Sequence, residues 1–134
     1  MGSDLACSHD LFCFACGKHN PHGFQLKFLS EQPGCARSHF IPEVFHQSYA
    51  DTLHGGIQSL ILDACMVQAV KSLGVECVTG KLEIRYQSPV SLKSEITILA
   101  EIEKRMGQFF VVTAQIQQGM VTTTKARGVY KYRE

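Results

Sequence analysis

The chain has 134 residues, of which 45% are hydrophobic and 19% are charged, and its formal net charge is +1. This length and composition predict one globular domain over residues 1–134 with a core of its own. The small net charge does not favour a nucleic-acid partner, and no apolar run approaches the length that crosses a membrane. The N-terminus has no basic region followed by an apolar stretch, so we expect a cytoplasmic protein.

An opening segment, residues 1–22, is rich in Cys, His and Gly. Its possible metal ligands are Cys7, His9, Cys13, Cys16, His19 and His22. One Cys-x-x-Cys with nearby histidines can supply tetrahedral zinc ligands, but a second such pair is absent and the spacing fits no standard finger. We therefore predict no metal site, and expect the segment to pack against the sheet or a neighbouring subunit.

Two strands are predicted next along the chain. The mixture of apolar and polar residues over 23–29 indicates a first strand, and the pattern over 35–41 indicates a second. Pro42 ends the second strand because proline cannot donate to a strand ladder. A loop is expected over 43–53.

A single helix is predicted over about 57–73. It begins after His54-Gly55-Gly56 and stops at Gly74, a residue typical of helix ends. Apolar residues occupy most of its positions, and a helix that is apolar almost all round is buried on most sides.

The rest of the chain alternates between apolar and polar residues with a period of two. This pattern predicts four half-buried strands, at 78–86, 95–103, 109–116 and 125–132. On one face of the last strand lie Ala126, Gly128, Tyr130 and Tyr132. Gly107 and Gln118-Gly119 predict tight connections between consecutive strands. The elements together predict an α+β domain, in which an antiparallel sheet of about six strands curves around one helix.

The glycine pair at the helix start is a candidate oxyanion hole. The first N–H groups of a helix have no partner inside it, and the helix dipole favours negative charge there. The backbone of Gly55 and Gly56 is open to close approach. Such donors stabilise the transition state of acyl transfer. The alternative is that the pair is only a flexible entry to the helix, with His54 as a packing residue.

Asp63 is the only acidic residue in the predicted helix. Its neighbours one turn away are Ser59 and Val67, so no helical salt bridge compensates its charge. A carboxylate in such an apolar setting has little structural use, whereas a general base or nucleophile requires one. The alternative is that Asp63 is an ordinary exposed aspartate on the solvent-facing side of the helix.

The spacing of these features has a consequence for assembly. Gly55 and Asp63 are separated by about 12 Å along the helix axis, at 1.5 Å per residue. Groups so far apart cannot both contact one carbonyl. If both act on the same substrate, they come from different subunits, most simply across a two-fold axis.

These residues resemble a known family. His54-Gly55-Gly56, then Ile61-Leu62-Asp63, then the run from Arg85 to Val90 are similar to the hotdog-fold acyl-CoA thioesterases of the phenylacetate-pathway type. The opening Cys13-Phe14-Ala15-Cys16-Gly17 resembles a subgroup of that family. The resemblance implies hydrolysis of acyl-CoA thioesters in a homodimer or dimer of dimers. It implies no cofactor, because CoA is part of the substrate.

The resemblance also implies roles for individual residues. Gly55 would donate the oxyanion N–H with Gly56 beside it, and Asp63 of the other subunit would be general base or nucleophile. Thr79 would orient the attacking water, and His54 would position the loop or the substrate. Many members carry an Asn or Gln a few residues before the histidine. Here Gln47 and Ser48 both remain candidates for that role.

Cations are needed for the phosphates of CoA. The candidates are Arg85, Lys104, Arg105 and either Lys125 or Arg127. The alternative for each is an ordinary solvated strand face.

A different function on the same fold would be a non-catalytic module that binds acyl-CoA or lipid. Asp63 argues against it, because a pure binder gains nothing from a carboxylate beside the acyl group. A hotdog dehydratase ranks last, because its helix would need a histidine as the base.

Overall fold

A computed structural model describes residues 3–5 and 11–134 of the chain. One long helix, α1 (Gly55–Lys71), and a single 3-10 turn, η1 (Val44–His46), accompany seven strands in this part of the chain. The strands are β1 (Ser3–Leu5), β2 (Phe28–Ser30), β3 (Cys35–Phe40), β4 (Glu76–Tyr86), β5 (Ile96–Met106), β6 (Phe109–Gln118) and β7 (Val121–Arg133).

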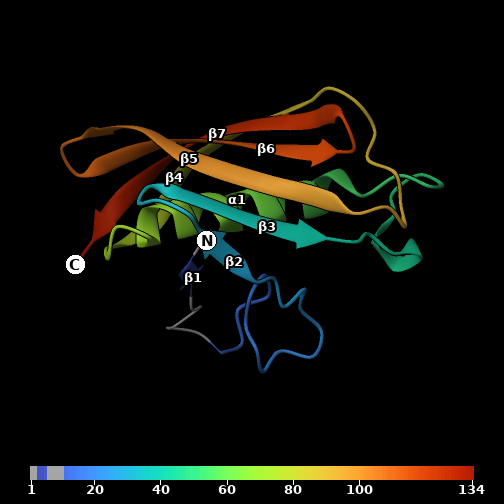
Figure 1. Ribbon diagram of the computed structural model, residues 1–134, viewed down its shortest axis with the longest axis horizontal. Coiled ribbons are helices and arrows are strands. Elements are labelled where there is room, and N and C mark those ends of the chain that lie inside the picture. Colours follow the sequence, from blue (N-terminus) through green and yellow to red (C-terminus); the bar gives the residue numbers. More distant parts are fainter. Residues whose placement is uncertain (1–2, 6–10) are drawn as a thin grey trace.

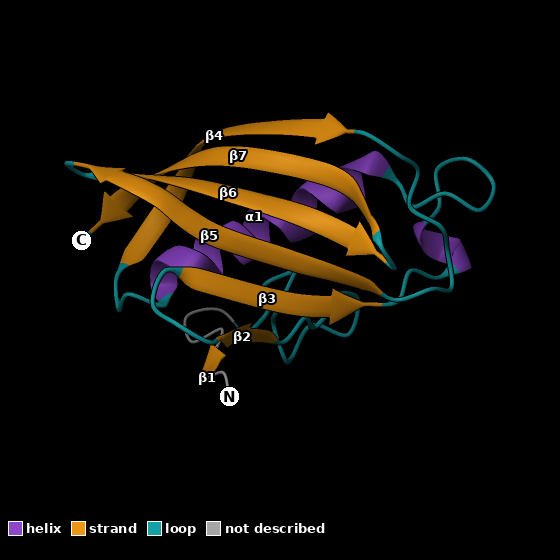
Figure 2. Cartoon of the chain, turned by 45° about the horizontal axis from the view of Figure 1, so that its top comes forward, coloured by secondary structure: helices purple, strands orange, loops and turns teal. Residues whose placement is uncertain are grey.

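All the strands belong to one antiparallel sheet in the order β1-β2-β3-β5-β6-β7-β4. The sheet curves over α1, which packs against β3, β4, β5 and β6 (Figures 1 and 2). The expected architecture is confirmed, and β1 is a strand beyond the six expected. β4 lies at one edge of the sheet, so its outer backbone groups have no strand beside them within the described chain.

Helix α1 is buried on most sides, as its composition predicts. Its buried residues include Ile61, Leu62, Cys65, Met66, Ala69 and Val70, which pack with the inner faces of the strands. The helix begins two residues earlier than predicted and includes both glycines. It ends at Lys71, two residues before the predicted end, and Gly74 terminates it as expected: Gly74 has a φ of +81°, and its N–H donates to Lys71 O at 2.9 Å.

The strand predicted at 23–29 is wrong over most of its length, because β2 begins only at Phe28. Residues before it bond to the opening segment instead: Phe24 N–H donates to Phe14 O and Leu26 N–H donates to Ala15 O. Gln25 between them has a φ of +50°, which interrupts an extended strand.

The opening segment from residue 11 onward packs on the domain, as predicted. Ala15 and Cys16 are buried. The Phe14 ring contacts the Phe24 ring edge to face, and Phe24 in turn contacts Phe40 at the end of β3. Aromatic packing therefore ties this segment to the sheet.

Two-residue turns join β5 to β6 and β6 to β7. Gly107 and Gly119 take positive φ values of +59° and +61° at these turns, as tight hairpins require. Both connections were predicted from the sequence. The register also shifts in three strand pairs: between Thr79 and Lys81 where β4 pairs with β7, between Ile102 and Lys104 where β5 pairs with β6, and between Ile116 and Gln117 where β6 pairs with β7.

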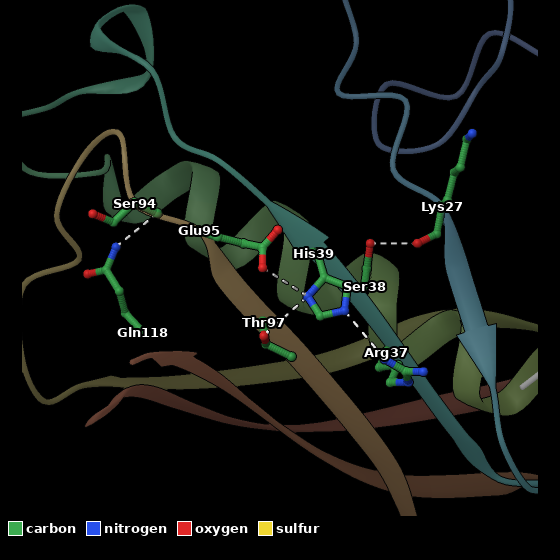
Figure 3. Close-up of polar contacts among 8 residues, drawn as sticks. All are labelled: Lys27, Arg37, Ser38, His39, Ser94, Glu95, Thr97 and Gln118. Atoms are coloured by element: carbon green, nitrogen blue, oxygen red, sulfur yellow. Dashed lines mark hydrogen bonds and ion pairs between the residues drawn. The ribbon is translucent and has the colours of Figure 1, made fainter. Parts of the chain in front are cut away.

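Polar contacts cover part of the sheet near β3 (Figure 3). Ser38 Oγ donates to Lys27 O at 2.7 Å and fixes β3 to the residues before β2. His39 lies beside Arg37, Thr97 and Glu95, and is exposed.

Among the described residues, no helix combines the length and the apolar character needed to span a membrane.

Candidate active site

The start of α1 is capped by His54. Its Nδ1 accepts a hydrogen bond from the Gly56 N–H at 2.8 Å. The expectation that both glycines offer open N–H groups is therefore wrong for Gly56 in this conformation. The imidazole fills the capping role that Ser, Thr, Asp or Asn usually takes.

The Gly55 N–H has no hydrogen-bond partner among the described residues. Tyr86, at the end of β4, holds the same residue from the other side, because its hydroxyl donates to Gly55 O at 2.9 Å. A Cβ on Gly55 would lie 3.4 Å from the Tyr86 ring. Gly55 therefore has one N–H without a partner, at the positive end of the helix dipole. The hydrogen bond from Tyr86 to its carbonyl holds the Gly55 backbone in place.

Asp63 lies in the middle of α1 and is half-buried. The sequence expectation of a carboxylate without a partner is wrong, because two hydroxyl groups donate to it. Thr79 Oγ1 lies 2.9 Å from Asp63 Oδ1, and the Tyr130 hydroxyl lies 2.8 Å from the same oxygen. The partners come from β4 and β7 rather than from the helix, which is why helical spacing did not reveal them. Asp63 Oδ2 has no hydrogen-bond partner in the described part of the chain.

The bulge in β4 brings Thr79 to Asp63. Thr79 is paired with Tyr130 on β7, but the next pair in register is Lys81 with Val129, so Gly80 is the extra residue. A bulge redirects the side chains of its strand. Strict alternation along the strand predicts that Thr79 lies on the opposite face of the sheet from Leu82 and Ile84. In the structure the bulge puts Thr79 on the same face as these two residues, toward α1.

Tyr130 was not recognised as a site residue from the sequence. The pattern placed it correctly on the inner face of the last strand, and its side chain has 0% exposure. A buried tyrosine hydroxyl needs a hydrogen-bond partner, which was the one available signal. Burial, and then the neighbouring Asp63 carboxylate, raise the pKa of Tyr130 far above its usual range. The hydroxyl is therefore protonated and acts as a donor to Asp63.

The loop before the helix is fastened to the helix start. His54 N–H donates to His46 O at 2.9 Å, and Leu53 N–H donates to Val90 O at the same distance. The Gln47 side chain accepts from the Asp51 N–H at 3.4 Å, so it stabilises the turn of this loop. Ser48 is exposed, and its side chain has no such bond among the described residues.

The five candidate cations are all exposed, and the structure does not gather them at one place. Arg85 is paired with Lys125 across β4 and β7, on the face of the sheet turned away from α1. Lys104 and Arg127 border a hollow of about 280 Å³ on that face, where Arg127 also pairs with Glu103 at 2.7 Å. Arg105 instead lies 4.8 Å over the Phe110 ring, and its Nε donates to Gly107 O.

The predicted absence of a metal site stays a prediction, because Cys7 and His9 lie outside the described residues. Within 3–5 and 11–134, no three His, Cys, Asp or Glu side chains are grouped as metal ligands. The sulfur atoms of Cys13 and Cys16 lie 3.5 Å apart.

The fold is shared with several solved structures. One is a thioesterase superfamily protein with a TM-score of 0.80 and 19% identity, which covers 92% of this chain while this chain spans only 60% of that one. Another is the Escherichia coli PaaI protein from the phenylacetic acid degradation operon, with a TM-score of 0.78, 19% identity and coverage of 83% and 81%. A third is a hypothetical thioesterase protein from Streptococcus pneumoniae with coenzyme A. Its TM-score is 0.75, its identity is 20%, and the coverage is 80% and 87%.

Sequence comparison assigns the family. A search among curated proteins finds no significant match. The family model described as the thioesterase superfamily, however, matches residues 50–124, which include the helix start, Asp63, Thr79 and most of the sheet. This match covers more than half of the chain, and the protein therefore belongs to the thioesterase superfamily, as a thioester hydrolase with the hotdog fold.

Proposed function

We propose that the protein hydrolyses acyl-CoA thioesters to a free acid and CoA. The observation that carries the proposal is the state of Asp63. Both hydroxyl donors bind its Oδ1, which leaves Oδ2 available on the half-buried middle of the helix. A carboxylate held in this way can accept a proton or attack a carbonyl without first reorganising.

Gly55 is proposed to stabilise the oxyanion. When the thioester carbonyl carbon is attacked, its π electrons move to oxygen, and the Gly55 N–H donates to that oxygen. The tetrahedral intermediate then collapses, the carbonyl reforms, and the C–S bond breaks to release CoA as thiolate, which takes up a proton. Gly56 contributes by holding the His54 cap in place rather than as a second donor.

Asp63 is proposed as the general base or the nucleophile. As a base, its Oδ2 takes a proton from water while the water oxygen attacks the carbonyl. As a nucleophile, Oδ2 attacks directly, and water then hydrolyses the resulting anhydride. Thr79 supports either route by binding Oδ1. Its hydroxyl is also exposed and close enough to orient the attacking water.

The pneumococcal relative offers support for this pair. Structures of that protein exist with an aspartate and with a threonine replaced by alanine. The two replaced positions are sixteen residues apart, the same separation as between Asp63 and Thr79.

A homodimer is the proposed minimum unit, and a dimer of dimers remains open. Gly55 and Asp63 lie about 12 Å apart along α1, too far for one chain to place both at one carbonyl. The eleven-residue edge strand β4 offers backbone groups to a second copy. Beside it, Leu60, Ala64 and Val67 are only partly buried on α1. A two-fold axis there would bring Asp63 of one subunit to Gly55 of the other.

The CoA phosphates are proposed to bind exposed cations. Lys104 has no ion pair among the described residues and is free to bind a phosphate, whereas Arg105 is held over Phe110. Arg85 is the other candidate, near the end of β4.

The cytoplasmic location expected from the sequence stays a prediction.

The test is hydrolysis of a panel of short, long and aromatic acyl-CoAs, followed by release of free thiol, with the Asp63→Asn protein beside the wild type. Asparagine keeps an oxygen that accepts from Thr79 and Tyr130, so the variant should fold and bind CoA esters. It cannot take a proton from water, so turnover should fall about 10² or more. Glu101→Gln, which neutralises an exposed carboxylate on β5, is the matched control and should keep full activity. Wild-type turnover in Asp63→Asn would refute the proposed role and favour a binding module.

A further inference from the structure

Tyr130 occupies an unusual place for a core aromatic residue. It is the largest of the fully buried side chains, and its ring lies along β7 over Gly128. A Cβ at Gly128 would lie 2.6 Å from Tyr130 Cε2 and 3.1 Å from the hydroxyl oxygen. Any residue other than glycine at 128 would therefore displace the ring. The missing side chain at Gly128 therefore leaves the space in which the Tyr130 ring takes this orientation.

That orientation aims the hydroxyl at Asp63. Tyr130 and Thr79 are cross-strand partners, and both donate to Oδ1 of the carboxylate, at 2.8 Å and 2.9 Å. Two donors on one oxygen fix the rotation of the carboxyl group about its Cβ–Cγ bond. Oδ2 is consequently directed away from both hydroxyl groups, toward the remaining open side of the carboxylate.

The buried Tyr130 hydroxyl needs a hydrogen-bond partner, and the partner it has is the Asp63 carboxylate rather than a backbone carbonyl. Tyr132 provides the comparison, because it lies two residues further along β7 on the same face and packs against the same core. Its hydroxyl has no hydrogen bond among the described residues. The two tyrosines therefore separate the contribution of an aromatic ring from that of a hydroxyl bound to Asp63.

We propose that Tyr130 is a positioning residue for the reacting carboxylate: it fixes Asp63 through Oδ1, so that Oδ2 is presented to the thioester or the attacking water. This inference rests on the proposed function of Asp63. Thr79, on the exposed side, and Tyr130, on the buried side, then act as a pair, and Tyr130 is the member that water cannot replace.

The test is the Tyr130→Phe protein, with Tyr132→Phe as the matched control. Phenylalanine keeps the ring and removes only the hydroxyl. We expect kcat to fall about tenfold in Tyr130→Phe, with KM changed less than about twofold, because the lost interaction acts on the reacting group. The acidic limb of its pH–rate profile should move to higher pH, because the ionised carboxylate has lost a donor that favours it. Tyr132→Phe should match the wild type in kcat, KM and pH profile.

A double-mutant cycle shows whether the effect passes through Asp63. In an Asp63→Asn background, Tyr130→Phe should cause no further loss, since there is no reacting carboxylate left to position. Additive losses would overturn the inference, as would a Tyr130→Phe protein with wild-type kcat and pH profile. Equal losses in the two tyrosine variants would indicate packing alone and also overturn it. If the wild type hydrolyses no thioester, the proposed function fails, and this inference fails with it.

Discussion

The hydroxyl of Tyr86 donates a hydrogen bond to the carbonyl of Gly55, and a Cβ on Gly55 would lie 3.4 Å from the edge of the Tyr86 ring. The end of strand β4 thus holds the first turn of α1, although the two residues are 31 positions apart in the sequence. The contact fixes the peptide that carries the one open N–H at the helix start.

Gly55→Ala and Gly55→Val should give a graded loss of activity. An alanine Cβ would lie 3.4 Å from the Tyr86 ring, an ordinary contact, so this variant should fold normally. Valine adds two methyl groups that crowd the approach to the N–H, and loss of one oxyanion donor lowers kcat by roughly 10²–10³. Steady-state kinetics and thermal melting of both variants measure the effect. A folded Gly55→Val protein with full activity would show that the oxyanion hole lies elsewhere.

Thr79→Val should lower kcat at least about tenfold, because the Asp63 carboxylate loses a hydrogen bond of the kind made to charged groups. Thr79→Ser retains the hydroxyl and should recover most of that rate. The comparison of the two kcat values is the measurement. If valine and serine are equivalent, Thr79 has no part in the reaction.

Two inactive variants should complement each other if the site is shared between subunits. In a mixed dimer of Gly55→Val and Asp63→Asn chains, one of the two sites has both an intact Gly55 and an intact Asp63. After full subunit exchange at equal amounts, about a quarter of wild-type activity should return. Thiol release before and after exchange, with sedimentation equilibrium to follow assembly, measures this. An active monomer, or no recovery after verified exchange, would contradict the shared site.

Stability should decrease in mild acid because of His46. Its ring lies among Phe24, Phe40 and Phe45, and its Nδ1 accepts from the Glu43 N–H at 2.9 Å. Burial lowers the pKa of His46 below 6.5, while the charge of Glu43 opposes the shift in part. As the pH falls, His46 therefore takes up its proton at a higher pH in the unfolded chain than in the folded protein. The free energy of unfolding should be greatest above pH 6.5 and fall as the pH drops toward the folded value.

Denaturant melts of the wild type and His46→Asn between pH 7.5 and pH 5 test this effect. Asparagine can accept from the Glu43 N–H but does not titrate, so its stability should vary less over this range. Because His46 O also accepts from the His54 N–H, loosening of this turn should reach the helix start. Parallel pH profiles for the two proteins would exclude His46 as the source.

Removal of metal ions should leave the activity unchanged, because the proposed steps use only the Gly55 N–H and the Asp63 carboxylate. Dialysis against a chelator, followed by the thiol-release assay and elemental analysis, checks this. About one zinc per chain together with inactivation would contradict the prediction and make the opening Cys/His segment a site.

Much of the fold followed from local signals in the sequence. An apolar run between glycines predicted the helix, period-two alternation predicted the last four strands, and Gly107 and Gly119 marked their turns. These signals are local because side-chain direction repeats every few residues in each element. The same local chemistry singled out Gly55 and Asp63: a glycine at a helix start and an acid in an apolar helix.

The tertiary structure decided how those groups are held. Thr79 reaches Asp63 only because of the bulge at Gly80, and Tyr130 reaches it from 67 residues away. His54 takes the Gly56 N–H, and residues 24–26 pair with the opening segment rather than extending β2. Each of these depends on register and on side-chain contacts between distant segments. Residue periodicity encodes which face a side chain occupies, but the partner it meets there is set by how the strands and the helix pack together.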